Sequence, residues 1–275
     1  MVDYRGDRNM HITSRRLILS ILFILCLSFQ ASAWCPTTVL SGTSETAIAC
    51  SSCTPGDPSD IFCEDGENSG DHWCSWADQV SSGNSVTFAG HSDTLSCTDK
   101  GDYAIVFDVD GSNGELAALG MSISATGVFY AKFYVNITAM SYDSGTQFEI
   151  MTLEGSTAWL VGLYFGHEDG NEKFRMYVNG QGGNLEVDGP NISTGTWYKV
   201  ELFFTKNSAD AAGAYFKVDG TQYSLSGDST ENINVDHVDL GSDDRSYAVD
   251  ATDTITFEMD IIKTDDDATP GDCAS

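Results

Sequence analysis

The sequence TWYKVELFFT, residues 196–205, alternates apolar and polar side chains along its length. One face of an extended strand would carry Tyr198, Val200, Leu202 and Phe204, and the other Trp197, Lys199, Glu201 and Phe203. Such alternation is typical of a β-strand with one buried and one solvated face. The stretch AYFKVDG, residues 214–220, repeats the pattern and ends in Asp-Gly, which favours a tight hairpin turn. These segments therefore predict an antiparallel β-structure.

The same pattern extends over most of the chain. Further strands are expected at residues 86–88, 104–109, 128–137, 147–153, 158–165, 173–178, 235–240 and 254–262. No window shows a helical period longer than two turns. This many short strands without helices predict an all-β fold, either an antiparallel two-sheet β-sandwich or a barrel.

The first 33 residues have the layout of a secretory signal peptide. Arg15 and Arg16 precede the apolar run 17–29, and the small residues 31–33 form a cleavage signal. The alternative is a membrane anchor, but this run is shorter than the ~20 residues that a bilayer requires. We therefore expect a secreted protein, located outside the cell or at its surface.

The cysteines agree with an oxidising compartment. Seven follow the leader: Cys35, Cys50, Cys53, Cys63, Cys74, Cys97 and Cys273. In a secreted protein they predict disulfides, and the odd number leaves one cysteine free or bonded to another chain. Zinc binding is a weaker alternative. The pairing stays open, with Cys74–Cys97 and Cys63–Cys273 as candidates. We expect a disulfide-tied extension rich in Cys, Ser and Thr at 34–60, followed by one β domain at 61–275.

The net charge is −28, from 13 basic and 41 acidic residues. Binding to nucleic acid or anionic lipid depends on Lys and Arg, so this balance argues against both partners. The electrostatic field of so negative a chain is also poorly suited to attracting a polyanionic sugar polymer.

Four segments resemble laminin-G-like domains of the concanavalin-A-like lectin-glucanase (jelly-roll) superfamily. They are Trp-aromatic-x-Val at 197–200, Tyr-x-x-Val-Asp-Gly at 215–220, a strand ending in Leu-Gly at 235–241, and a closing strand at 257–262. The resemblance covers roughly residues 61–265 and implies a jelly-roll sandwich whose opening strand, 61–65, pairs beside the last one. The superfamily includes lectins, adhesion modules, glycoside hydrolases and polysaccharide lyases, so the fold alone does not select an activity.

The resemblance implies two enzymatic alternatives. Glu258 and Asp260 match part of the Glu-x-Asp-x-x-Glu strand of laminarinase-type hydrolases, which supplies two catalytic carboxylates. However, Lys263 replaces the last Glu, and the strand is the last one, where that family uses a central one. Glu149 and Glu154 are five residues apart, which places them on opposite faces of an unbroken strand.

A lyase would instead need a base and a partner for a uronate carboxylate. Residues 213–217, Gly-Ala-Tyr-Phe-Lys, resemble a strand of alginate lyases. The Gln-x-His and Arg-x-Glu-x-Arg motifs of that family are absent from the sequence. The expected outward side chains suited to these roles are Tyr130, Lys132, Arg175, Tyr177, Lys199, Tyr215 and Lys217.

The leading hypothesis is glycan or cell-surface recognition without catalysis, on the concave sheet or loop rim of the sandwich. Sugars pack on aromatic rings and are oriented by nearby polar groups. The candidate ligand-binding residues are Tyr130, Lys132, Trp159, Tyr164, Arg175 and Tyr177. The alternatives are a polysaccharide-degrading enzyme on the same face and an adhesion protein without a sugar ligand.

Calcium is a possible cofactor, because Asp108, Asp110 and Asn113 offer oxygen ligands on a short loop that is not an EF-hand. Residues 243–244 and 265–267 are alternative acidic clusters. Asn136 and Asn191 lie in glycosylation sequences, which matter only in a glycosylating host.

Overall fold

A computed structural model describes the part of the chain that forms the β domain. The described residues are 60–64, 77–81, 83–90, 103–113, 116–168, 170–180, 182–206, 213–225, 230–242 and 249–265. All of them belong to one unit, Glu45–Ser275. The predicted signal peptide, the predicted extension 34–60 apart from its last residue, and the cysteines Cys35, Cys50, Cys53, Cys74, Cys97 and Cys273 lie outside these residues. Of Cys63, the structure describes the backbone.

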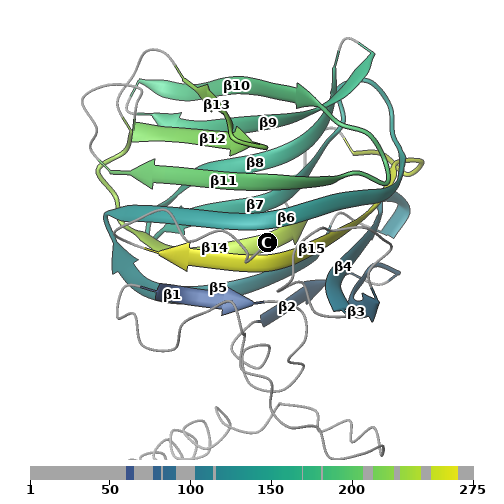
Figure 1. Cartoon of the computed structure of the whole chain (residues 1–275), viewed down its shortest axis with the longest axis horizontal. Coiled ribbons are helices and arrows are strands. Elements are labelled where there is room, and N and C mark those ends of the chain that lie inside the picture. The colour runs from purple at the N-terminus through teal and green to yellow at the C-terminus, as the bar shows by residue number, and fades with distance from the viewer. Residues whose placement is uncertain are drawn as a thin grey trace, which may run out of the picture. The chain divides into compact units, whose positions relative to one another are not determined.

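Two antiparallel sheets form the domain (Figure 1). Sheet A has the order β13 (Thr221–Ser224), β12 (Ala214–Val218), β11 (Trp197–Thr205), β6 (Val128–Ser141), β15 (Thr254–Asp265), β4 (Tyr103–Asp110) and β3 (Ser85–Gly90), and β1 (Asp60–Glu64) also pairs with β15. Sheet B has the order β10 (Gly183–Asn191), β9 (Asn171–Gly180), β8 (Ala158–Glu168), β7 (Gln147–Gly155), β14 (Val235–Ser242), β5 (Ala117–Thr126) and β2 (Ala77–Val80). A short 3-10 helix, η2 (Gly111–Asn113), follows β4. The prediction of an all-β sandwich is confirmed, and the opening strand β1 pairs with the last strand as expected.

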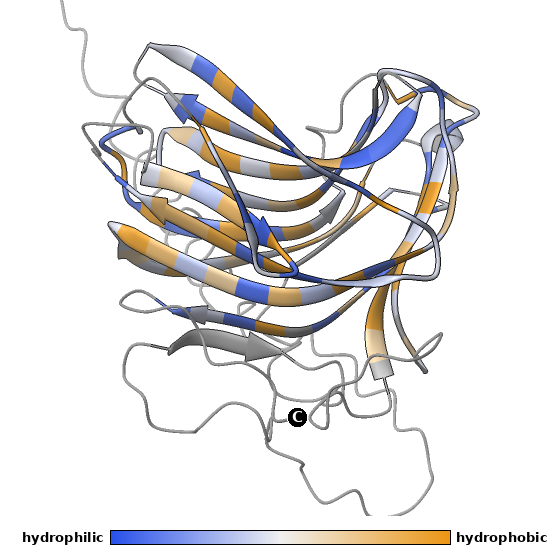
Figure 2. Ribbon diagram, turned by 45° about the horizontal axis from the view of Figure 1, so that its top comes forward, coloured by the Kyte–Doolittle hydropathy of each residue, from blue (hydrophilic) through white to orange (hydrophobic). Residues whose placement is uncertain are grey.

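The hydrophobic core lies between the two sheets. The predicted inward face of β11 is buried, with Val200, Leu202 and Phe204 exposed by 1% or less. Phe257 of sheet A stacks on Phe107 of the neighbouring strand at 4.9 Å between ring centroids. It also meets Phe165 of sheet B edge-on at 5.6 Å. Figure 2 shows the alternation of apolar and polar residues along the strands that produces this core.

The predicted strand that ends in Leu-Gly is β14. Gly241 has φ +94°, a conformation that favours glycine. A Cβ atom there would lie 2.4 Å from the Ala117 carbonyl oxygen and equally close to the Phe107 ring. Glycine is therefore required where β14 passes β5 and the core ring.

Strands β2, β5, β10 and β13 were not predicted from the sequence. Strand β5 contains small residues, and β10 contains Gly189 and Pro190. Pro190 is tolerated because β10 lies at the edge of sheet B, where a missing N–H breaks no ladder between strands. Among the described residues, no helix is long and apolar enough to span a membrane.

Candidate functional site

The outward face of sheet B carries rows of directly paired residues, which point to the same side of the sheet. One row runs from β7 to β10 and consists of Glu149, Tyr164, Arg175 and Asp188. The next runs from β14 to β10 and consists of Asp239, Thr152, Gly162, Tyr177 and Glu186. We call these two rows, together with Gln147 and Lys173, the sheet B polar face. Five strands thus bring together residues that are far apart in the sequence.

Tyr177 contacts three other side chains of this face. Its hydroxyl oxygen accepts hydrogen bonds from Gln147 Nε2 at 2.9 Å and from Arg175 Nη1 at 3.3 Å. The Arg175 guanidinium also lies over the Tyr177 ring, 5.9 Å from its centroid, and the Tyr164 ring meets the same ring edge-on at 5.4 Å. Because the phenol oxygen accepts two bonds, its own proton is directed elsewhere and can be donated to a ligand.

Two glycines of β8 make room for this arrangement. A Cβ atom on Gly162 would lie 2.5 Å from the Tyr164 ring, so that ring lies over the glycine. A Cβ atom on Gly166 would lie 3.3 Å from the Gln147 side chain. Gln147 Oε1 and Thr152 Oγ1 are buried and have no hydrogen-bond partner among the described residues. They can bond to a ligand or to water.

The two positive side chains on this face, Arg175 and Lys173, share one carboxylate. Asp188 accepts hydrogen bonds from Arg175 Nε and from Lys173 Nζ, each at 2.7 Å. Burial works to raise the pKa of Asp188, but the bonds from Arg175 and Lys173 outweigh it and lower this pKa. For Arg175, burial works to lower the pKa, and the bonds to Asp188 and Tyr177 raise it. Both groups therefore stay charged and balance each other.

Replacement of Asp188 by Asn should destabilise the protein in a pH-dependent way. Since the folded-state pKa of Asp188 is lowered, its contribution is present above the unfolded-state value and is lost as pH falls through the folded value. We expect the D188N variant to unfold at lower urea than wild type at neutral pH, and the difference to shrink below about pH 4. Urea titrations across pH measure this, with Glu186→Gln on the same strand as the control. A difference that stays constant down to acid pH would contradict it.

The strand β7 is not regular, and this corrects one expectation. Its register with β8 shifts between Glu149 and Met151, which leaves Ile150 as an extra residue in a β-bulge. Glu149 pairs with Tyr164, and Glu154 pairs with His237 of β14. The two glutamates therefore share the outward face, in different rows, and do not point to opposite faces.

The six predicted ligand-binding residues divide between the two sheets. Trp159, Tyr164, Arg175 and Tyr177 belong to the outward face of sheet B. Tyr130 and Lys132 lie on the outward face of sheet A, where Tyr130 packs against Phe203 at 4.7 Å. The core separates these faces, so one ligand cannot contact both sets. Among the other lyase candidates, Lys199, Tyr215 and Lys217 also lie on sheet A.

Glu258 and Asp260 also belong to sheet A. They are 4% and 0% exposed, and Asn136 Nδ2 donates a hydrogen bond to Glu258 Oε2 at 3.3 Å. Their strand β15 is last in the sequence but lies between β6 and β4, so it is an interior strand of the sheet. Asn136 is itself 2% exposed, which closes it to glycosylation in the folded state, whereas Asn191 is exposed.

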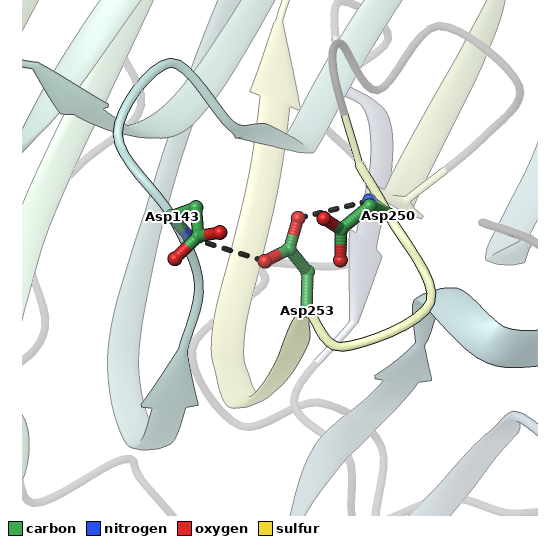
Figure 3. A group of neighbouring side chains, drawn as sticks. All are labelled: Asp143, Asp250 and Asp253. Atoms are coloured by element: carbon green, nitrogen blue, oxygen red, sulfur yellow. Dashed lines mark hydrogen bonds between the residues drawn. The ribbon is translucent and has the colours of Figure 1, made fainter.

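A group of three acidic side chains lies at one end of the sandwich. Asp143, Asp250 and Asp253 have carboxylate oxygens within 4.8 Å of one another and could hold a metal ion (Figure 3). Asp253 accepts hydrogen bonds from the Asp143 and Asp250 backbone amides at 3.1 and 2.9 Å, and from Thr146 Oγ1 at 2.9 Å. It therefore ties the β6–β7 turn to the turn before β15.

The predicted calcium ligands Asp108 and Asp110 are not members of this group, although Asp110 pairs with Thr254, next to Asp253. Asp108 accepts a hydrogen bond from Thr256 Oγ1 at 2.8 Å, and Asp110 accepts one from the Ser112 amide at 2.9 Å. The side chain of Asn113 is outside the described residues. The acidic group that the structure does assemble was not predicted, because it depends on β15 pairing with β6, which brings two distant turns together.

Sequence reasoning also missed Gln147, Thr152 and Asp188 on sheet B. Gln147 alternates with apolar Phe148 in a predicted strand, so its outward direction could have been inferred. That of Thr152 could not, because the extra residue Ile150 shifts the alternation before it. Asp188 could not, because its strand β10 gave no strand signal.

No protein-family profile and no curated protein matches the chain. Solved structures do resemble it. The carbohydrate esterase vb_24B_21 from Shiga toxin-encoding bacteriophage phi24B has a TM-score of 0.51 at 10% identity, covering 75% of this chain and 98% of that chain. The cellulose induced protein Cip1 has a TM-score of 0.52 at 14% identity, covering 76% of this chain and 100% of that chain. Alginate lyase A1-II′, a member of polysaccharide lyase family 7, has a lower TM-score of 0.44 at 15% identity, covering 58% of this chain and 78% of that chain. The chain is thus a jelly-roll β-sandwich.

Proposed function

We propose that the protein binds a polysaccharide on the sheet B polar face. The observation that carries this proposal is the contact of Tyr177 with Gln147, Arg175 and Tyr164 on that face. An aromatic ring beside fixed hydrogen-bonding groups is the combination that recognises sugars, because the ring packs against C–H groups and the polar atoms orient hydroxyls. The rows of residues across β7, β8, β9 and β10 suit an extended chain.

The charges favour a neutral polymer. Arg175 and Lys173 both donate to Asp188, and Glu186 and Asp239 bring two further acidic side chains to the same face. The whole chain has a net charge of −28. A polyanion would be repelled by this field, whereas neutral hydroxyl groups would not. Two proteins of similar fold, a carbohydrate esterase and a cellulose induced protein, agree with a carbohydrate ligand.

Secretion and kinship with laminin-G-like domains belong to the same proposal. Their support is the leader pattern at 1–33 and the strand motifs at 197–200 and 215–220. A disulfide-linked partner would make use of the odd cysteine. Electrophoresis without reducing agent tests this last point, and a purely monomeric band would count against such a partner.

The proposal is tested by incubating the protein with a panel of neutral and acidic polysaccharides and separating each mixture on a size-exclusion column with light scattering. We expect co-elution with an intact neutral polymer. Absence of retention by every polymer in the panel would overturn the proposal. A shift of the polymer to smaller size would show that the face also cleaves its ligand.

A polysaccharide-cleaving enzyme is the second candidate, and the same contact favours it. Elimination from a uronate needs a base near the sugar and a cation for the carboxylate, which Tyr177 and Arg175 could supply. The balanced charge of Arg175 argues against this reading. Incubation with polyuronates, followed by ultraviolet absorbance of the unsaturated product, distinguishes it from binding.

Calcium is proposed as the ion for the group of Asp143, Asp250 and Asp253, because carboxylate oxygens are the ligands that Ca²⁺ prefers. The melting temperature measured with calcium and with chelator tests this. An identical value in both conditions would exclude a stabilising calcium at this group.

A further inference from the structure

A serine, a histidine and an aspartate form a hydrogen-bonded chain on the outward side of sheet B. Ser122 Oγ of β5 lies 3.3 Å from His237 Nδ1 of β14, and His237 Nε2 lies 3.2 Å from Asp239 Oδ1. The strand register explains the arrangement, because His237 pairs directly with Ser122 and Asp239 is two residues further along the same strand. Ser122 is exposed, His237 is partly exposed and Asp239 is 4% exposed.

The hydrogen bonds determine the roles of the two ring nitrogens. Asp239 is a carboxylate and can only accept, so Nε2 carries the proton and Nδ1 presents a lone pair to the Ser122 hydroxyl. Nucleophile, base and orienting carboxylate thus follow one another as in serine hydrolases, with the roles of the two ring nitrogens exchanged. The distances are slightly long, as is usual before substrate binds.

We propose that Ser122, His237 and Asp239 form an ester-hydrolysing site that removes acyl groups from a glycan. Ser122 Oγ attacks the ester carbonyl carbon while its proton passes to His237 Nδ1. The tetrahedral intermediate then collapses, the bond to the sugar oxygen breaks, and that oxygen takes the proton from His237. Water, deprotonated by His237, hydrolyses the acyl-serine, releases the carboxylic acid and restores the Ser122 hydroxyl.

The surroundings of Ser122 can supply hydrogen bonds to the developing oxyanion. Val235 pairs with Thr126 and His237 pairs with Ser122, so the register of β14 and β5 shifts between these two pairs. Three residues of β5, 123–125, therefore lie opposite one residue of β14, Asp236. On the other side of β5, strand β2 reaches only to Gly120. Within the described residues, the part of β5 around Ser122 therefore has a neighbouring strand on one side only. Backbone amides that are not used in a ladder can serve as donors to an oxyanion.

The site is continuous with the sheet B polar face. Asp239 is in the same row as Thr152, Gly162 and Tyr177, three strand spacings away from Tyr177. At ~4.8 Å per spacing this is about 14 Å, within the span of a short run of sugars. The choice of an acylated glycan as substrate rests on the proposed function, whereas ester hydrolysis itself does not.

The first test uses p-nitrophenyl acetate, which needs no glycan site. We expect Ser122→Ala and His237→Asn each to lose at least about 100-fold in kcat/KM. Ser141→Ala, an exposed serine at the end of β6, should behave like wild type. A serine-directed fluorophosphonate should label the peptide that contains Ser122 in wild type. Hydrolysis that survives in the S122A variant, no hydrolysis by wild type, or labelling elsewhere would overturn the proposal.

The pH profile gives an independent readout. The hydrogen bond to Asp239 raises the pKa of His237; burial opposes this, and the charges of Asp239 and Asp236 add to it. Glu154 of β7 also faces His237. Because the neutral imidazole is the base, the rate should rise with pH through this raised pKa. The D239N variant should be slower and should move that limb to lower pH, and an unmoved limb would contradict the orienting role.

The outcomes separate this site from the glycan-binding proposal. The S122A variant should still co-elute with the neutral polymer that wild type binds. Ester hydrolysis without glycan retention would remove the polymer proposal and keep the catalytic site. Retention of the glycan without ester hydrolysis would remove the catalytic site and keep the polymer proposal. With both present, release of acetate from an acetylated form of the retained polymer should be lost in S122A.

Discussion

Replacement of Tyr177 by alanine should reduce the affinity for the polysaccharide by tenfold or more. This change removes the ring beside Tyr164 and the hydroxyl that Gln147 and Arg175 contact. Aromatic residues at the centre of a binding face contribute about 2 kcal/mol or more, which corresponds to more than tenfold in affinity. Titration calorimetry with the polymer found in the panel measures the loss. The Y177F variant keeps the ring and should show a smaller effect.

The control is an aromatic residue on the opposite face. Tyr215 of sheet A has a comparable partly buried ring, which stacks on Phe203 at 4.8 Å. Tyr215→Ala should leave the affinity unchanged, and so should Tyr130→Ala. If the sheet A variants lost binding while Tyr177→Ala kept it, the glycan would lie on sheet A and the assignment of the face would be wrong.

Replacement of Asp253 by alanine should lower the free energy of unfolding by about 2–4 kcal/mol. Asp253 is 1% exposed, and its carboxylate accepts the Asp143 amide, the Asp250 amide and the Thr146 hydroxyl. The change leaves three donors without their acceptor and releases the turn before β15 from the β6–β7 turn. Urea unfolding in the presence of chelator measures this contribution without any metal.

Asp250→Ala is the matched variant. Asp250 is exposed, and its carboxylate accepts the Thr252 amide and hydroxyl within its own turn, each at 2.7 Å. In chelator it should cost much less stability than Asp253→Ala. If calcium binds, Asp250→Ala should also abolish the stabilisation that calcium gives to wild type. Equal, small effects of both variants in chelator would show that Asp253 does not hold the turns together.

The strands were predictable where alternation is strong, as in residues 128–137, 173–178 and 196–205. Their placement in the sheets was not. Tyr130 and Tyr177 have the same sequence context, an aromatic residue on the polar side of an alternating strand. They lie on opposite faces because β6 belongs to sheet A and β9 to sheet B. The alternation within a strand predicts whether a side chain points toward the core or away from it. Which sheet the strand joins depends on pairing with strands that are distant in the sequence.

Other differences have equally local causes. The extra residue Ile150 reverses the direction expected for Glu154 relative to Glu149. The strand β10 was not predicted because Gly189 and Pro190 are typical of a turn. Asp188, the ion-pair partner of Arg175, lies on this strand and was missed for the same reason. For the chain Ser122–His237–Asp239, the sequence offered one signal: His237 and Asp239 are two residues apart and therefore share one face of a predicted strand. The serine could be added only when the register of β5 and β14 was known.

The central claim is that the glycan lies on the sheet B polar face. Mapping of backbone amide chemical shifts by NMR during titration with the retained polymer tests it most directly. The account predicts that the shifted amides belong to β7, β8, β9, β10 and β14. Shifts concentrated in β6, β11 and β12 of sheet A, or no shifts at saturating polymer, would contradict it.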